Sequence, residues 1–204
     1  MKPDEIERAS FQIIDQEAGS HHYTEQQWSI VRRIIHTTAD FEFKEMVRFH
    51  PDAISAGIEA IRNGKMIVTD TNMARVGIRK KESEQFGGNV KCYINDPLIH
   101  EKAALTGGTR AKAAVDMAIS EMKDGIYVVG NAPTALLRLI ELIGEQKAHP
   151  ALIIGLPVGF VNAAESKAAL VEMDTPYITN VGRKGGSNAA ASVVNALAIM
   201  AVEA

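Results

Sequence analysis

Cysteine is almost absent from this sequence, since Cys92 is the single one among 204 residues. One cysteine excludes an internal disulfide framework and a multi-cysteine metal site, and it indicates a reducing compartment. Cys92 lies in the strand-like run at residues 90–94, where we expect a buried thiol. None of the six histidines is paired at metal-ligand spacing apart from the adjacent His21 and His22. No metal site built by the protein is therefore expected.

Long apolar runs and basic clusters are also missing. No window approaches the roughly 18 continuous apolar residues that span a bilayer, and the N-terminal MKPDE lacks the apolar region of a signal peptide. The formal net charge is -3, and the longest basic run is Arg79 to Lys81. We therefore expect a soluble cytoplasmic protein with neither a nucleic-acid partner nor a membrane partner.

Hydrophobic residues make up 46% of the chain, which is enough for one sizeable core, so we expect a single domain over residues 1–204. Residues 1–64 predict amphipathic helices. Residues 65–204 alternate short apolar runs, turns and alanine-rich helices. This alternation is typical of a three-layer α/β/α fold with a mostly parallel sheet of about five strands. The predicted strands cover residues 65–70, 90–94, 126–129, 151–154 and 177–181.

Two copies of one βα pattern follow each other between Ile126 and Leu170. In each copy an apolar run breaks at a glycine, Gly130 or Gly155, passes a proline turn and enters a helix. In open parallel sheets, ligands bind beyond the carboxyl ends of the strands, where these turns are expected. The functional site should therefore lie at this edge of the sheet.

Three turns at this predicted edge combine glycines with polar residues, at residues 107–112, 130–134 and 182–188. Each precedes a helix, and the free N–H groups of helix N-termini bind anions. Ordinary βα turn chemistry explains each turn taken alone, but three together favour a polyanionic ligand. A nucleotide or phosphosugar stays open as an alternative, although no P-loop is present and GxGxxG does not follow the first strand. The candidate contacts at these turns and strand ends are Thr69, Thr109, Arg110, Asn131, Arg183 and Ser187.

His36 falls on the polar side of the helix that the capping box from Thr24 to Gln27 begins. It lies one turn beyond Arg32 and Arg33. A histidine in such a place is often only a solvated residue. Its other interpretation is proton transfer near neutral pH. Serine esterase chemistry has no support, because the sequence contains no G-x-S-x-G elbow.

Five segments together resemble the precorrin-8X methylmutase family, called cobalt-precorrin-8 methylmutase in the anaerobic branch of cobalamin biosynthesis. The resemblance extends from about residue 10 to about residue 197. Its most specific part is GNAPTAL followed by GxPVGFVxAAESK. The five segments are RRIIH, DTNMARVGI, GNAPTALLRLIE, GLPVGFVNAAESK and GRKGGSNAAA.

The resemblance implies an isomerase that moves a methyl group from C11 to C12 of a corrinoid by a 1,5-sigmatropic shift, giving hydrogenobyrinate or cobyrinate. It implies no redox or nucleotide cofactor, and any cobalt would be carried by the substrate. The family's catalytic histidine falls on His36, as proton donor and acceptor, and substrate contacts fall on Ser10 and Arg110. A homodimer with the substrate near the subunit interface is implied too. A corrinoid carrier without turnover stays open as a further alternative.

Overall fold

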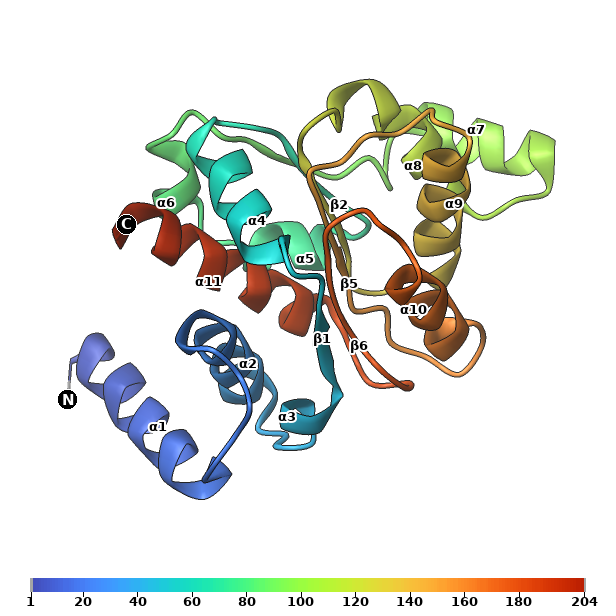
Figure 1. The fold of residues 1–204 in the computed structure, drawn as a ribbon. Helices are drawn as coiled ribbons and strands as arrows, with labels where there is room; N and C mark the ends of the chain where they lie inside the picture. The colour runs from blue at the N-terminus through green and yellow to red at the C-terminus, as the bar shows by residue number, and fades with distance from the viewer. Residues whose placement is uncertain (1, 204) are drawn as a thin grey trace.

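The computed structural model describes residues 2–203, apart from the side chains of Asp4, Lys80 and Ser83. Met1 and Ala204, the ends of the predicted domain, lie outside this range. The described residues form a six-stranded sheet with helices on both faces (Figure 1). The strands are β1 (Val47–Phe49), β2 (Ile67–Thr69), β3 (Val90–Lys91), β4 (Ile126–Val129), β5 (Leu152–Gly155) and β6 (Tyr177–Asn180). The α-helices are α1 (Pro3–Ala18), α2 (Glu25–Thr38), α3 (Phe43–Met46), α4 (Ala53–Arg62), α5 (Asn72–Gly77), α6 (Lys80–Glu84), α7 (Pro97–Thr106), α8 (Arg110–Ala118), α9 (Pro133–Gly144), α10 (Ala163–Val171) and α11 (Ser187–Glu203).

The sheet has the strand order β1-β6-β5-β4-β2-β3, and all neighbours are parallel except β1, which runs antiparallel to β6. The predicted α/β class with three layers is confirmed, but the prediction of about five strands is one too low. The missing strand is β1, which lies in the segment predicted to be helical. It spans only three residues and pairs with a single neighbour, so its sequence carries little strand pattern.

The two faces of the sheet are covered by different helices because neighbouring side chains of a strand point to opposite faces. On β4, Ile126 and Val128 pack with α2, α4 and α11, whereas Tyr127 and Val129 pack with α8, α9 and α10. Figure 1 shows α4 and α11 on one side of the strands and α8, α9 and α10 on the other. Strands buried on both faces explain the continuous apolar runs of the sequence.

The helix α2 starts with the predicted capping box. The Thr24 hydroxyl accepts a hydrogen bond from the N–H of Gln27, and the Gln27 side chain accepts one from the N–H of Thr24. At the other end, Ala39 adopts a left-handed conformation with φ of 53° and stops the helix. His36 therefore lies in the last turn of α2, and α2 packs against α11.

The segment between β3 and β4 differs from the prediction. β3 ends at Lys91 and does not continue to residue 94, so the thiol of Cys92 lies just beyond the strand and is half-buried. The helix α7 was not predicted. It begins after Asp96, whose carboxylate accepts a hydrogen bond of 2.9 Å from the N–H of Leu98, with Pro97 in the first turn.

The helix α11 approaches the end of β4 so closely that only glycine fits at residue 130. A Cβ atom there would lie 2.6 Å from the Cα of Ser187. We expect Gly130→Ala to lower the free energy of unfolding by about 1–3 kcal/mol, because backbone on both sides must move apart. Gly144→Ala is the matched control, since a Cβ at Gly144 meets no atom within 4 Å. Thermal unfolding of the two variants checks this, and equal melting temperatures would contradict it.

Candidate active site

The direction of strand succession reverses between β2 and β4, at the centre of the sheet. From β2 the chain passes to β3 on one side, then returns to β4 and continues outwards through β5 and β6. In open α/β sheets such a switch point opens a crevice at the carboxyl ends of the strands. Two hollows lie at this edge of the molecule, one beside α2 and the other between β2, β4 and α8.

The first hollow contains the predicted catalytic residue. Ser10 on α1 and His36 on α2 line the same hollow of about 290 Å³. The imidazole of His36 is exposed, and its ring meets the edge of the Phe11 ring at a centroid distance of 5.3 Å. The Ser10 hydroxyl donates to the carbonyl of Ile6 at 2.8 Å, which leaves its lone pairs facing outwards as acceptors. Apart from Glu17, the other lining residues are apolar: Ile13, Ile14, Ile35, Ala39 and Phe41.

Three cationic side chains near His36 are paired with acidic ones. The guanidinium of Arg32 binds Asp15 at 2.8 Å, and that of Arg33 binds Glu7 at 2.9 Å. Lys184, from the loop after β6, binds both Asp40 and Glu42.

The hydrogen bond from Lys184 holds the pKa of the Asp40 carboxyl below its usual range. Lys184 therefore serves to tie this loop to the end of α2. It is not a free cation for an anionic ligand.

The second hollow brings together three predicted contacts, Thr109, Arg110 and Asn131, in a space of about 310 Å³. Thr109 is the N-cap of α8, and its hydroxyl lies 3.0 Å from that of Thr134 on α9. The exposed guanidinium of Arg110 lies 3.4 Å from the ring of His100. A cation beside two hydroxyl groups is a suitable receptor for a carboxylate.

Asp70 lies at the floor of the second hollow and was missed by the sequence analysis. It follows β2 directly, and its carboxylate accepts hydrogen bonds from the backbone N–H groups of Gly130, Asn131 and Ala132 at 2.9, 2.8 and 2.8 Å. Burial raises the pKa of this carboxyl, although the three donors oppose the shift. The expectation that these N–H groups bind an external anion is therefore wrong, because Asp70 already occupies them.

Two other predicted contacts are buried. Thr69 is 2% exposed, and its hydroxyl donates to the carbonyls of Thr71 and Lys91, so it opens to neither hollow. Ser187 is 6% exposed, and its hydroxyl lies 2.8 Å from that of Thr71. Both side chains hold the loops at the sheet edge together.

The first turn of α11 lies between the two hollows. On one side the Asn188 amide donates to the carbonyl of Thr37 in α2, at 3.4 Å. On the other side the hydroxyl of Ser187 contacts that of Thr71, which lines the second hollow together with Asp70. His36 and Arg110 thus stand on one continuous edge, with α11 between them.

The loops after β5 and β6 are bound to each other beside this edge. The N–H of Gly159 donates to the carbonyl of Arg183 at 3.1 Å, and that of Gly186 donates to the carbonyl of Leu156 at 2.9 Å. The exposed guanidinium of Arg183 lies 5.6 Å from the centre of the Phe160 ring, which is 84% exposed. Arg183 is therefore available to a ligand, unlike Lys184.

The buried side chain of Lys167 on α10 holds the loop after β6 in place. It is 1% exposed, and its ammonium donates to the carbonyl of Lys184 at 2.6 Å and to the side chain of Asn180 at 3.3 Å. Desolvation lowers the pKa of Lys167 from 10.5 to about 8. The folded protein therefore releases this proton at a lower pH than the unfolded chain does.

The shift of Lys167 predicts a pH-dependent stability. Between about pH 8 and 10.5 the unfolded chain binds more protons at this position than the folded protein, so the contribution of Lys167 to stability rises with pH through that window. Relative to Lys167→Met, we expect the wild type to gain on the order of 3 kcal/mol across it. Urea unfolding at several pH values measures this difference. Lys147→Met, at an exposed lysine, should run parallel to the wild type, and a parallel Lys167→Met curve would contradict the prediction.

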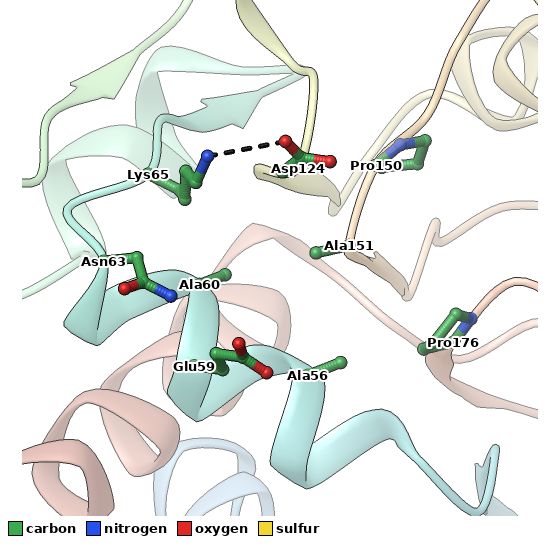
Figure 2. A pocket seen from close by; sticks show the side chains of 9 residues that line it. All are labelled: Ala56, Glu59, Ala60, Asn63, Lys65, Asp124, Pro150, Ala151 and Pro176. Carbon is green, nitrogen blue, oxygen red and sulfur yellow. Dashed lines mark hydrogen bonds and ion pairs between the residues drawn. The ribbon is translucent and has the colours of Figure 1, made fainter.

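Another hollow lies at the opposite edge of the sheet. It measures about 520 Å³ and is lined by residues that precede β2, β4, β5 and β6 together with one side of α4. Figure 2 shows the side chains of Lys65 and Asp124 facing each other at one side of it. The ammonium of Lys65 and the carboxylate of Asp124 form an ion pair of 3.4 Å. None of the predicted site residues lines it. The amino ends of parallel strands are not the usual place for a ligand, and no site is assigned here.

Comparisons with known proteins point in one direction. Residues 5–200 match the family described as Precorrin-8X methylmutase. A cobalt-precorrin-8 methylmutase from Priestia megaterium is 50% identical over 201 residues, covering 98% of this chain and 89% of that protein. One from Leptospira interrogans is 42% identical, covering 96% of this chain and 92% of its own.

A solved structure of a precorrin-8X methyl mutase from Thermus thermophilus has the same fold. It superimposes with a TM-score of 0.92 at 44% identity, covering 98% of this chain and 97% of that one. Among residues 2–203 no helix is long and apolar enough to cross a membrane. The resemblance carried by the five sequence segments is confirmed over nearly the whole chain, and the chain belongs to the precorrin-8X methylmutase family.

Proposed function

We propose that this protein moves a methyl group from C11 to C12 of cobalt-precorrin-8 to give cobyrinate, as an isomerase of cobalamin biosynthesis. The observation that carries the proposal is the pairing of an apolar hollow beside His36 with a carboxylate-binding hollow beside Arg110, on one edge of the sheet. Cobalt belongs to the substrate. Curated relatives named for the cobalt-containing substrate are 40–50% identical to this chain, and two curated relatives named for precorrin-8X are 35% and 36% identical. The Thermus thermophilus structure, also named for precorrin-8X, is 44% identical, so both substrates enter the test below.

His36 is the proposed proton donor and acceptor. A methyl shift within one molecule needs no redox or nucleotide cofactor, but it does need a tautomer of the macrocycle from which the methyl group can migrate. Protonation of the ring by the exposed imidazole of His36 would give that tautomer, and return of the proton would restore the histidine. Ile13 and Phe41 would hold the apolar ring face, and Ser10 would accept a hydrogen bond.

The acidic arms of the corrinoid are assigned to two arginines at this edge, Arg110 and Arg183, which form no ion pair with an acidic side chain that the structure describes. Arg110, with Thr109 and the side chain of Asn131, would bind one arm in the second hollow. Arg183 would bind another at the exposed rim beside Phe160. Thr69 and Ser187 support the loops and are left out of this set, because their hydroxyl groups are buried and bonded.

A homodimer fits the shape of the site. The hollow beside His36 is smaller than a corrinoid macrocycle, and Ile13 at its rim is 54% exposed. A second copy placed over this face would cover the apolar side chains and exclude water from the ring. We place this assembly in the cytoplasm, where the other enzymes of a soluble tetrapyrrole pathway would supply its substrate.

Two alternatives are less well supported. A nucleotide-binding enzyme would use the N–H groups after β4 for a phosphate, but Asp70 occupies them. A corrinoid carrier would bind substrate through the same residues without converting it. The difference between carrier and enzyme lies in turnover.

The test is to incubate purified protein with cobalt-precorrin-8 and, separately, with precorrin-8X. Because the reaction is an isomerisation, the product has the mass of the substrate and must be detected by the absorbance spectrum of the corrinoid. We expect many equivalents of product for each protein chain. A spectrum that changes by no more than one equivalent identifies a carrier, and no binding of either corrinoid refutes the proposal.

A further inference from the structure

A carboxylate side chain of the protein, that of Asp70, occupies the backbone donors at the switch point of the sheet. The turn from Gly130 to Ala132 presents three consecutive backbone N–H groups at the start of α9, a helix of 12 residues. Donors of this kind at a helix N-terminus bind phosphate or carboxylate groups of ligands in many α/β proteins. Here the carboxylate of Asp70 takes all three, from the neighbouring strand.

Asp70 is held firmly in this position. It is 2% exposed, and its backbone N–H donates to the carbonyl of Val128 at 3.0 Å, which continues the pairing of β2 with β4. The next residue, Thr71, caps α5 through the N–H of Ala74 and contacts Ser187 at the start of α11. The backbone that carries the Asp70 side chain is therefore fixed by β4, α5 and α11.

The fixed carboxylate changes what the second hollow can accept. Both Asp70 and the exposed guanidinium of Arg110 line it, and the hydroxyl groups of Thr109 and Thr134 lie 3.0 Å apart. An anion that approached the floor would meet the acceptor oxygens of Asp70, and the three N–H donors there are already engaged. An anion at the rim would meet Arg110 and the two hydroxyl groups.

We propose that Asp70 is a positioning residue whose carboxylate fills the anion-binding turn between β2 and β4, so that an acidic arm of the substrate is directed to Arg110, Thr109 and Thr134. This inference rests on the proposed function for the identity of the arm. The internal bond itself does not depend on it. Thr134 becomes a further contact of the acidic arm, beside the residues already assigned.

Asp70→Asn tests the positioning role with an isosteric side chain. If the amide oxygen keeps the bonds to Asn131 and Ala132, the NH₂ group faces the N–H of Gly130, and two donors meet where one bond was. The turn must move and the contacts of the arm with it. We expect KM to rise about tenfold and kcat to stay within about threefold, because binding is lost without loss of the proton donor. Asp124→Asn, at the opposite edge, should leave both unchanged.

The kinetic outcomes separate a positioning role from other roles. An unchanged KM for folded Asp70→Asn overturns the inference, and so does a fall in kcat at constant KM. If the wild type converts no corrinoid at all, the proposed function fails instead.

Hydrogen exchange on the wild type provides a second measurement that needs no variant to fold. The amides of Gly130, Asn131 and Ala132 should exchange slowly without ligand, relative to the exposed amides of residues 107 and 108. Adding the corrinoid should leave their exchange unchanged, since Asp70 already binds them. Rapid exchange in the free protein, or protection that appears only with the corrinoid, overturns the inference.

Discussion

His36→Ala is expected to lower kcat by roughly 100- to 10,000-fold, the usual contribution of one general acid and base. The imidazole is exposed in the last turn of α2. It contacts the Phe11 ring but is not part of the hydrophobic core. Its removal should therefore leave the fold and the affinity for the corrinoid nearly unchanged. Turnover followed by corrinoid absorbance, together with product binding followed by the same signal, separates the two effects.

His149→Ala is the matched control for this variant. His149 is also exposed, but it lies before β5 at the opposite edge of the sheet, and its ring contacts the carbonyl of Gln146. It should turn over substrate like the wild type. Turnover near that of the wild type in His36→Ala would remove the histidine from the mechanism.

Arg110→Gln is expected to weaken corrinoid binding by about 10- to 100-fold, which is the range for loss of one charge-assisted hydrogen bond to a carboxylate. Arg110 lies at the first position of α8 with its guanidinium exposed at the second hollow. Its contact with His100 is a long one of 3.4 Å, so the fold should not depend on it. Titration of the variant with cobyrinate measures the dissociation constant directly.

Lys112→Gln removes the same charge from the same helix and serves as the comparison. Lys112 is paired with Glu141 at 3.7 Å and does not line the second hollow. A change of affinity through net charge alone would affect both variants equally, and it would decline with added salt. A local contact predicts a loss confined to Arg110→Gln, and equal losses would contradict it.

Much of the fold follows from local patterns. The buried strands β4 and β5 are continuous apolar runs closed by a glycine, and the capping box fixes the start of α2. The edge strand β1 could not be recognised, because three residues paired on one side carry no periodicity. The helix α7 was overlooked although Asp96-Pro97 is an ordinary helix start.

The site was less accessible to sequence reasoning than the fold. Periodicity places His36 on the polar side of α2, but only the resemblance to a family gave that residue a chemical role. Position at a strand end suggested Thr69 and Ser187 as contacts, although both point into the protein. Asp70 was not suggested by any pattern, although it lines the second hollow. Its hydrogen-bond partners lie about 60 residues further along the chain, so no local sequence pattern reveals them.

The pairing of β1 with β6 has a consequence for the order in which the protein is assembled. The strand β1 cannot pair until β6 has been synthesised, and α2 cannot bury its apolar face until α11 is present. Contacts between such distant segments form late, since the intervening chain must be ordered first. On the ribosome, the βα units from β2 to β5 can associate before β6 has emerged. The surface beside His36 is then among the last parts to form, so we expect partly synthesised chains to lack the proposed corrinoid site.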